Sequence, residues 1–292
     1  MNANHLRIFA EKNPDRVRIR ESVRYPGLFV VKYHNRVFYK NLWTPELREM
    51  RGLVVDEDWN VVVRPFTKIF NRGENKTNIP RDEMVVAVRK INGYMGAVTR
   101  TEKHGLIIST TGSLDSDFVD MTRDNIAHVS DDMWHEGWTY LLEVVDPRDP
   151  HIVEEATGAY LIGMRNVETG EMIGENMLDR IAGEMGLMRP EWFVDRFSNV
   201  VQRATECQHE GFMVYGETKS LKLKSPYYLT KKLFARIRAD KLASEKFWEN
   251  DPKEKLEEEY YPLVDHIREN LDAFCGLDEQ GRIKFMEDFL HG

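Results

Sequence analysis

The sequence predicts an α+β protein rich in antiparallel β-hairpins, with a small helical segment toward its C-terminal end. Short β-branched and aromatic runs alternate with turn residues over much of residues 28–228. From Leu229 onward the pattern is helical, with Pro252 and Pro262 expected to break it. No G-x-G-x-x-G or Walker sequence follows a strand, so a doubly wound nucleotide-binding fold is not predicted.

The elements of the first half are expected in the following order. Residues 1–25 form a helix or loop, and a hairpin follows whose strands, 28–33 and 36–41, flank a His34-Asn35 turn. A short helix over 43–50 has Thr44 as its N-cap and Pro45 at its first position. Two strands around a turn at 56–60, and then a strand that begins at Val85, complete this half.

The second half continues with hairpins and adds helices. The predicted elements are a hairpin over 94–113 that turns at 103–105, a helical stretch over 115–135, a strong strand over 138–147 that its proline ends, a hairpin over 159–174 that turns at 168–170, helices over 176–186 and 191–207, and a strand pair over 210–228. This order of elements predicts antiparallel sheets in the body of the protein.

The composition is that of a globular protein, with 41% hydrophobic and 31% charged residues among 292. No apolar run is long enough to span a bilayer. Charged residues lie near the N-terminus, where a signal peptide would have its apolar core. The two cysteines, Cys207 and Cys275, give neither a disulfide framework nor metal-ligand spacing. These features predict a cytoplasmic protein with no membrane partner.

The formal net charge of -8 argues against a nucleic-acid partner only until its distribution is considered. Residues 242–292 hold 14 acidic and 6 basic side chains, which leaves 35 of each in the body. A local basic surface therefore remains open. Two basic runs stand out, although a solvated face is the simpler interpretation of the first: Arg16, Arg18, Arg20 and Arg24, and the run over 219–238.

Lys90 stands at the end of the strand that begins at Val85, directly before an Asn92-Gly93 turn. A lysine at a strand end can be desolvated and flanked by other cations, and both effects make it a better nucleophile. For this short motif alone, a lysine that faces water before a hairpin is the more common case.

Several other charged residues interrupt apolar strands. Lys68 lies between Phe66 and Phe70, and Glu143 interrupts the run 140–145. Each position alone has an ordinary explanation, such as an edge strand, a snorkelling lysine or a solvated sheet face. Together they suggest one face with cations for a triphosphate and carboxylates for a ribose diol and a hydrated metal. The members of this face are Lys68, Lys90, Glu143, Glu210, Lys222 and Lys224.

The order of these pieces resembles that of the covalent nucleotidyltransferases, which comprise the ATP-dependent ligases and the RNA capping enzymes. The matching motifs are K-x-N-G at Lys90, L-E-V-V at Glu143, the strand over 159–166, E-G at Glu210 and K-L-K at Lys222. Arg51-Gly52 and the stretch 65–71 resemble one branch, the bacteriophage RNA ligase 1 family. The resemblance runs from about Phe29 to Tyr228. It implies an antiparallel-sheet, ATP-grasp-like nucleotidyltransferase domain over 1–232 and a small acidic helical domain over 233–292.

The resemblance implies an ATP-dependent RNA ligase that works through a lysyl-AMP and an RNA-adenylate. Its substrates would be ATP and RNA with 5′-phosphate and 3′-hydroxyl ends, with repair of tRNA as one role. Mg²⁺ or Mn²⁺ would be the cofactor. The protein is expected to be a monomer, in the host cytoplasm if a bacteriophage encodes it.

The resemblance also implies roles for single residues. Lys90 would be the nucleophile, and Gly93 would let the backbone approach the nucleotide. Glu143 would hold the ribose, and Tyr160 would stack near adenine unless it belongs to the core. Arg51 and Lys68 would grip the outgoing phosphates beside Phe70 and Asn71, Lys222 and Lys224 would contact the α-phosphate, and Glu210 and Asn92 would hold the metal through water.

Two departures from the family pattern keep alternatives open. Asn92 stands where Asp is commoner, and Ser109, Thr110 and Thr111 stand where relatives often carry a lysine. A catalytically lapsed adenylate- or RNA-binding protein therefore remains an alternative, as does a structural α+β protein with surface charges. A DNA ligase or capping enzyme is a further alternative. The helical, acidic stretch after residue 228 disfavours it, because those enzymes usually append an OB-fold there.

Overall fold

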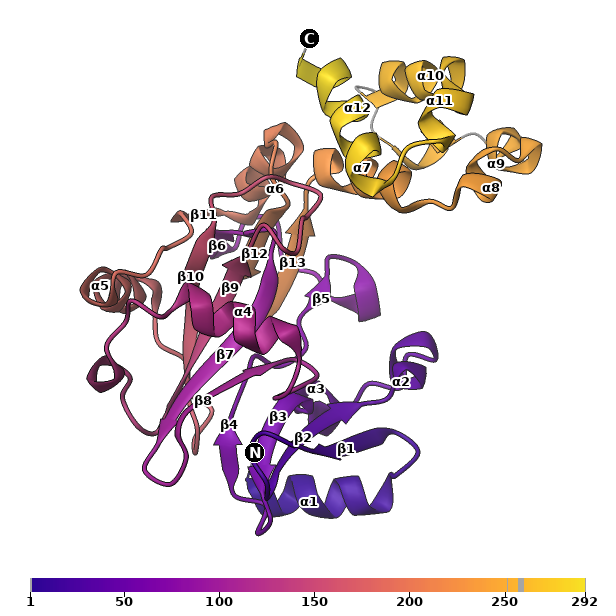
Figure 1. Ribbon diagram of the computed structural model, residues 1–292. Helices are drawn as coiled ribbons and strands as arrows, with labels where there is room; N and C mark the ends of the chain where they lie inside the picture. The colour runs from indigo at the N-terminus through magenta and orange to yellow at the C-terminus, as the bar shows by residue number, and fades with distance from the viewer. Residues whose placement is uncertain (1, 251, 257–259, 292) are drawn as a thin grey trace. The chain divides into compact units, whose positions relative to one another are not determined.

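The computed structural model describes residues 2–250, 252–256 and 260–291 (Figure 1). Its internal contacts divide the chain into two compact units, which we describe separately. Unit 1 comprises Met1–Thr77, Gly93–Asp149 and Ala156–Trp192, and unit 2 comprises Asn78–Asn92, Pro150–Glu155 and Phe193–Gly292. The boundary expected between residues 232 and 233 stays a prediction.

Unit 1 contains two antiparallel sheets, with strand orders β1-β2-β3-β4 and β10-β9-β7-β8. The strands are β1 (Val17–Glu21), β2 (Leu28–Tyr33), β3 (Arg51–Asp56), β4 (Val61–Val63), β7 (Tyr94–Thr101), β8 (Gly105–Thr110), β9 (Trp138–Val145) and β10 (Gly158–Asn166), with the short β5 (Phe70–Asn71) outside these two sheets. The helices are α1 (Ala3–Lys12), α2 (Asn35–Tyr39), α3 (Pro45–Glu49), α4 (Asp117–Asn125) and α5 (Glu175–Met185), with 3-10 turns η1 (Glu74–Lys76) and η2 (Asp131–Met133).

Successive side chains of a strand point to opposite faces of its sheet, and this alternation explains how the two sheets stack. Leu141 of β9 and Ala97 of β7 face Val30 and Val54 of the first sheet in one buried cluster. The opposite face of the second sheet is covered by α4 and α5, through residues such as Val119 and Leu178. Helix α1 covers the outer face of the first sheet. Glu143 is two residues from Leu141 and therefore belongs to the face that α4 and α5 do not cover.

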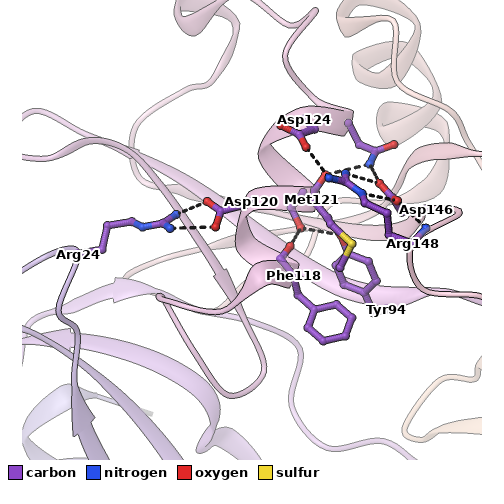
Figure 2. Close-up of polar contacts among 10 residues, drawn as sticks. Arg24, Tyr94, Phe118, Asp120, Met121, Asp124, Asp146 and Arg148 are labelled. Atoms are coloured by element: carbon purple, nitrogen blue, oxygen red, sulfur yellow. Dashed lines mark hydrogen bonds and ion pairs between the residues drawn. The ribbon is translucent and has the colours of Figure 1, made fainter.

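Polar contacts fix helix α4 over the second sheet (Figure 2). Arg24 makes an ion pair with Asp120 at 2.7 Å, and Arg148 makes one with Asp124 at 2.9 Å. Arg148 also pairs with Asp146 at 2.7 Å, directly after β9, which holds the pKa of Asp146 well below its usual range. These contacts tie the end of β9, and hence the strand that carries Glu143, to the helix above it.

Unit 2 joins a sheet to a helical bundle. The sheet has the order β11-β6-β12-β13, from β6 (Met84–Arg89), β11 (Trp192–Arg196), β12 (Gly211–Tyr215) and β13 (Ser220–Lys224). The helices are α6 (Phe197–Glu206), α7 (Pro226–Arg236), α8 (Ala239–Leu242), α9 (Glu245–Glu249), α10 (Tyr261–Glu269), α11 (Leu271–Cys275) and α12 (Glu279–His291), with the 3-10 turn η3 (Pro252–Lys255).

One face of this sheet is apolar and the other carries charge. Val85, Ala87, Val214 and Leu221 lie in one buried cluster with residues of α6. The residues between them along the strands project to the other face. The helices from α7 to α12 share a second buried cluster with Ile152 and Val153 of the segment 150–155. That segment therefore belongs to the helical part of unit 2 although it is far from it in sequence.

The α+β class with antiparallel sheets is confirmed, and so are most of the hairpins. The short helix with Thr44 as N-cap is also confirmed, because the Thr44 hydroxyl accepts the Leu47 amide. The strand predicted over 36–41 is wrong, since this stretch forms helix α2, whose Val37 side chain enters the cluster beneath α1. Residues 17–21, expected as helix or loop, form β1 because they pair with β2.

Four other predictions need correction. Residues 191–207 are not one helix, because 192–196 form β11 and α6 begins at Phe197, whose amide donates to the Glu83 carbonyl. The helical stretch 115–135 ends at Asn125. The hairpin over 159–174 forms and turns at 167–170, but its second arm is a single bridge from Met172 to Arg165 with flanking hydrogen bonds and is not a strand. Pro262 lies in the first turn of α10, where proline fits a helix, instead of breaking one.

Candidate active site

Strand β6 delivers Lys90 to the edge of the unit 2 sheet. The Lys90 amide donates to the Gly211 carbonyl at 2.9 Å, so the backbone pairing with β12 continues one residue past the strand. Register places Lys90 opposite Gly211, and Gly211 opposite Lys224. These positions lie on the charged face of the sheet because Val85 and Ala87 lie on the apolar one.

Glu210 reaches this face because a glycine follows it. Gly211 has φ +117°, and a Cβ atom there would lie 2.0 Å from the Leu223 carbonyl oxygen. Only glycine fits so close to the neighbouring strand. The E-G pair seen in the sequence is therefore a structural requirement for placing Glu210 at the start of β12.

Glu210, Lys90, Asn92 and Lys224 form what we call the lysine cluster. The Glu210 carboxylate is buried, 3% exposed, and accepts from Lys90 Nζ at 2.8 Å and from Asn92 Nδ2 at 2.8 Å. Lys224 Nζ lies 3.4 Å from the second carboxylate oxygen. Burial alone would raise the pKa of Glu210, but Lys90, Lys224 and Asn92 outweigh burial and its pKa lies below its ordinary value.

Lys222 and Lys224 share one face of β13, as period two predicts. Lys224 Nζ also lies 4.8 Å from the centre of the Tyr228 ring, which is a cation–π contact. Lys222 is opposite Met213, one row further along the sheet. The structure thus brings Lys90, Lys222 and Lys224 to the same face.

Asn92 is held from both ends of its amide. Its Nδ2 donates to Glu210, and its Oδ1 accepts the Val153 amide at 3.0 Å. A carboxylate at this position would place two negatively charged oxygens about 3 Å apart and would lose the donor. Asn92 therefore suits the Glu210 contact better than aspartate does when no cation is bound.

The Glu210 carboxylate can accept a further hydrogen bond, and a water molecule of a hydrated divalent cation could donate it. A carboxylate has about four lone-pair positions, and the three neighbours of Glu210 leave room for a metal-bound water. Among the described residues, no group of three or more His, Cys, Asp and Glu side chains is placed to hold a metal ion. Glu210 and Asn92 would hold Mg²⁺ or Mn²⁺ through water, and the cation would supply positive charge for a bound phosphate.

The remaining predicted site residues lie in unit 1. Gly93 begins the second segment of that unit, and its amide donates to Glu143 Oε1 at 3.3 Å. A Cβ atom on Gly93 would lie 2.3 Å from the Val144 carbonyl oxygen, so the strand that carries Glu143 leaves no room for a side chain. Packing within the protein therefore requires glycine at this position, whether or not a nucleotide approaches the backbone there.

Met95, Glu143 and Tyr160 are cross-strand neighbours on β7, β9 and β10. Tyr160 is buried, 6% exposed, and its hydroxyl donates to the Ala156 carbonyl at 3.0 Å. The structure therefore brings Tyr160 beside Glu143, as a ribose-and-base site requires. The burial of Tyr160 also fits the alternative that it belongs to the core.

Arg51 belongs to the same part of unit 1. Its Nη1 lies 3.6 Å from Met95 Sδ. Burial lowers the pKa of Arg51, and the nearby Tyr33 and Glu143 partly oppose this effect. A half-buried guanidinium next to Glu143 is placed to meet an anionic group on a ligand.

Lys68 lies in an aromatic box. Its Nζ is 5.5 Å, 5.6 Å and 5.4 Å from the ring centres of Phe38, Trp43 and Phe70, and 3.9 Å from a Glu74 oxygen. Asn71 binds the same Glu74 through both its backbone and its side-chain nitrogen. Phe70 and Asn71 therefore act on Lys68 by fixing it and its carboxylate partner.

Some residues around the lysine cluster had no sequence signal. Val153 holds Asn92, and Glu155 makes an ion pair with Arg89 at 2.8 Å, one residue before Lys90. Both come from the segment 150–155, which shows neither strand nor helix periodicity. Tyr228 does carry a sequence signal, because it is an aromatic residue four positions after Lys224 at a helix start.

The fold of this chain is that of nucleotidyltransferase-type ligases. An archaeal ATP-dependent RNA ligase superimposes with a TM-score of 0.62 at 14% identity, covering 96% of this chain and 78% of that one. A candidate ATP-dependent DNA ligase of Aquifex aeolicus superimposes with a TM-score of 0.61 at 15% identity, covering 98% and 80%. At such low identity these likenesses establish the fold alone.

The sequence comparisons narrow the class to a family. The family model described as RNA ligase matches residues 49–228, more than half of the chain. RNA ligase 1 of bacteriophage TS2126 is 34% identical over an aligned stretch that covers 44% of this chain and 39% of that relative. The aligned stretch thus spans less than half the length of the relative. The chain belongs to this RNA ligase family, as the ordered motifs predicted.

Proposed function

We propose that this chain is an ATP-dependent RNA ligase that joins 5′-phosphate and 3′-hydroxyl RNA ends through a lysyl-AMP and an RNA-adenylate. The observation that carries the proposal is the lysine cluster, in which a strand-end lysine lies beside a buried carboxylate and a second cation. Family membership and the named activities of relatives support the choice of ATP and RNA.

In the first step, Lys90 Nζ attacks the α-phosphorus of ATP, a P–N bond forms, and pyrophosphate leaves with the electrons of the α–β P–O bond. An ammonium ion has no lone pair, so Lys90 must leave its ion pair with Glu210 and lose a proton first. Its side chain is 19% exposed, which gives the proton a route to water. Lys222 and Lys224 would neutralise charge on the α-phosphate as it develops.

The second and third steps reuse the same groups. AMP passes from Lys90 to the RNA 5′-phosphate, and a 3′-hydroxyl then attacks that phosphate and releases AMP. Glu143 and Tyr160 would hold the adenosine throughout, and Arg51 and Lys68 would bind the outgoing pyrophosphate. A divalent cation near Glu210 and Asn92 would supply further charge neutralisation at the phosphates.

The test is incubation of the pure protein with Mg²⁺ and ATP labelled on the α-phosphate, followed by a denaturing gel. We expect a labelled band that Lys90→Ala abolishes. The matched control is Lys103→Ala, an exposed lysine in the turn between β7 and β8, which should label like the wild type. Labelling of Lys90→Ala at the wild-type rate would refute the mechanism.

A second arm separates the alternatives. Labelled GTP in place of ATP tests a capping-type enzyme, and nicked DNA in place of RNA tests a DNA ligase. Tight, reversible ATP binding without a covalent band would favour the lapsed enzyme and direct attention to Asn92. A tRNA substrate, a monomeric state and a cytoplasmic location remain parts of this proposal. Among the described residues, no helix has both the length and the apolarity to cross a membrane.

A further inference from the structure

Three adjacent strands of unit 1 carry a row of positive charges. Arg18 of β1 pairs in register with Lys32 of β2, and Lys32 pairs in register with Arg51 of β3. We call these three residues the cationic row. Cross-strand partners point to the same face, and like charges directly opposite each other destabilise a sheet. The row therefore costs stability unless an anion compensates it.

The protein supplies little compensation to Lys32 and Arg18, whereas Glu143 lies near enough to Arg51 to interact with its charge. Within residues 2–250, no carboxylate lies within 4.0 Å of the Lys32 ammonium or the Arg18 guanidinium in an ion pair. Asp15 is nearby, but it pairs with Arg36 at 2.9 Å. Burial lowers the pKa of Lys32, and the charges of Arg51 and Arg18 lower it further. The ammonium form of Lys32 is thus held in surroundings that would favour an added negative charge.

A cavity of about 290 Å³ opens over part of this row. Its walls come from unit 1 and consist of Asp15, Arg18, Lys32, Tyr33, His34, Asn35 and Arg36. With Asp15 neutralised by Arg36, the remaining wall is positive and carries an aromatic ring and an imidazole. On the far side of Lys32, a Cβ atom on Gly112 would lie 3.3 Å from its Nζ, so a glycine leaves the ammonium room.

We propose that this cavity binds phosphate groups of the RNA strand, with Arg18 and Lys32 as the contacts. The inference rests on the proposed function for the identity of the nucleic acid. Arg18 and Lys32 lie on neighbouring strands about 5 Å apart, so the pair can contact two neighbouring phosphates of one RNA strand. A cationic groove with an aromatic side chain is also the usual arrangement for single-stranded nucleic acid.

The experiment measures binding of a fluorescent, 5′-phosphorylated single-stranded RNA by anisotropy at several salt concentrations. Each phosphate contact to a single strand releases about 0.7 counterions, so losing one contact should weaken binding about eightfold at 50 mM salt. We expect this loss for Lys32→Gln and for Arg18→Gln, and roughly 60-fold for both together. The slope of log Kd against log salt should also fall by about 0.7 per substitution.

Arg20→Gln is the matched control. Arg20 lies on the same strand as Arg18 but outside the cavity wall, and Asp115 is near enough to interact with its charge. It should bind RNA like the wild type. An equal loss in Arg20→Gln would show that general surface charge is responsible and would overturn the proposal.

Thermal unfolding gives a second readout. A substitution that removes repulsion should leave Tm unchanged or raise it at low salt, whereas a structural role for Lys32 would lower Tm. The cavity could instead bind the pyrophosphate that leaves ATP. Measuring how strongly pyrophosphate inhibits lysyl-AMP formation in each variant tests this alternative. If Lys32→Gln binds RNA normally and only its response to pyrophosphate changes, the cavity serves the leaving group and the proposal fails. If the wild type forms no lysyl-AMP, the proposed function fails, whatever the RNA result.

Discussion

Replacing Glu210 with glutamine should show how much the lysine cluster contributes to stability. The carboxylate lies 2.8 Å from Lys90 Nζ and 3.4 Å from Lys224 Nζ. At an effective dielectric constant of about 20, these pairs attract by about 6 and 5 kcal/mol. Desolvation of the buried carboxylate offsets several kcal/mol of this attraction.

Breaking a fully buried ion pair costs about 3–5 kcal/mol. Lys90 and Lys224 keep 19% and 18% of their side-chain surface exposed and can regain water, so we expect a lower cost for Glu210→Gln. Our estimate is about 2–3 kcal/mol at pH 7. The isosteric amide keeps the shape of the side chain, which restricts the change to charge and hydrogen bonding.

The pH dependence gives the sign of the effect. Because the pKa of Glu210 is lowered in the folded protein, its ionised form stabilises the fold. This contribution is complete above the unfolded value of about 4.3 and is lost as the pH falls through the folded value. The difference between wild type and Glu210→Gln should therefore be constant from pH 8 to about 5.5 and shrink progressively below about pH 4.3.

Urea denaturation followed by circular dichroism at pH 7, 5.5 and 3.5 measures this difference. Glu206→Gln is the control, because Glu206 is exposed near the end of α6 and bonds only weakly to its neighbour Gln202. It should stay within about 0.5 kcal/mol of the wild type. A Glu210→Gln variant as stable as the wild type at pH 7, or a difference that persists unchanged at pH 3.5, would refute the reasoning.

Two further substitutions test the turn after Lys90. Asn92→Asp should raise the pKa of Glu210 and destabilise the protein by about 1–3 kcal/mol in EDTA, because a donor becomes a second carboxylate. Urea titrations with and without Mg²⁺ should show that the cation reduces this loss of stability. A variant as stable as the wild type in EDTA would contradict the geometry. Gly93→Ala should cost about 1–3 kcal/mol from overpacking, because its Cβ would meet a carbonyl oxygen at 2.3 Å; a melting temperature equal to that of the wild type would show that the strand yields freely.

Much of the site could be predicted because motif order survives in the sequence. Lys90, Glu210 and Lys224 were singled out as charges that interrupt apolar strands, and the structure joins them although 120 residues separate Lys90 from Glu210. The glycine after Glu210 was visible as well, and its positive φ explains it. The catalytic roles themselves stay predictions.

The features that could not be predicted from the sequence depend on the register between strands and on loops without periodicity. The cationic row exists only because register aligns Arg18 with Lys32, and a register cannot be read from one strand. The loop that supplies Val153 has no periodicity to detect. The strand wrongly expected over 36–41 is a short apolar run, for which helix and strand patterns are not distinguishable.

The interleaving of the two units along the chain has a consequence for biosynthesis. Unit 2 takes its residues from 78–92 and 150–155 as well as from 193 onward, so β6 leaves the ribosome long before its partner β12. At 5–20 residues per second, the 120 residues between Lys90 and Glu210 take roughly 6–24 s to synthesise. For most of that time neither β11 nor β12 has been made, so the apolar face of β6 has no sheet to join. The nascent chain should therefore need chaperone protection, and a truncation before Gly211 should yield an aggregation-prone protein instead of a smaller enzyme.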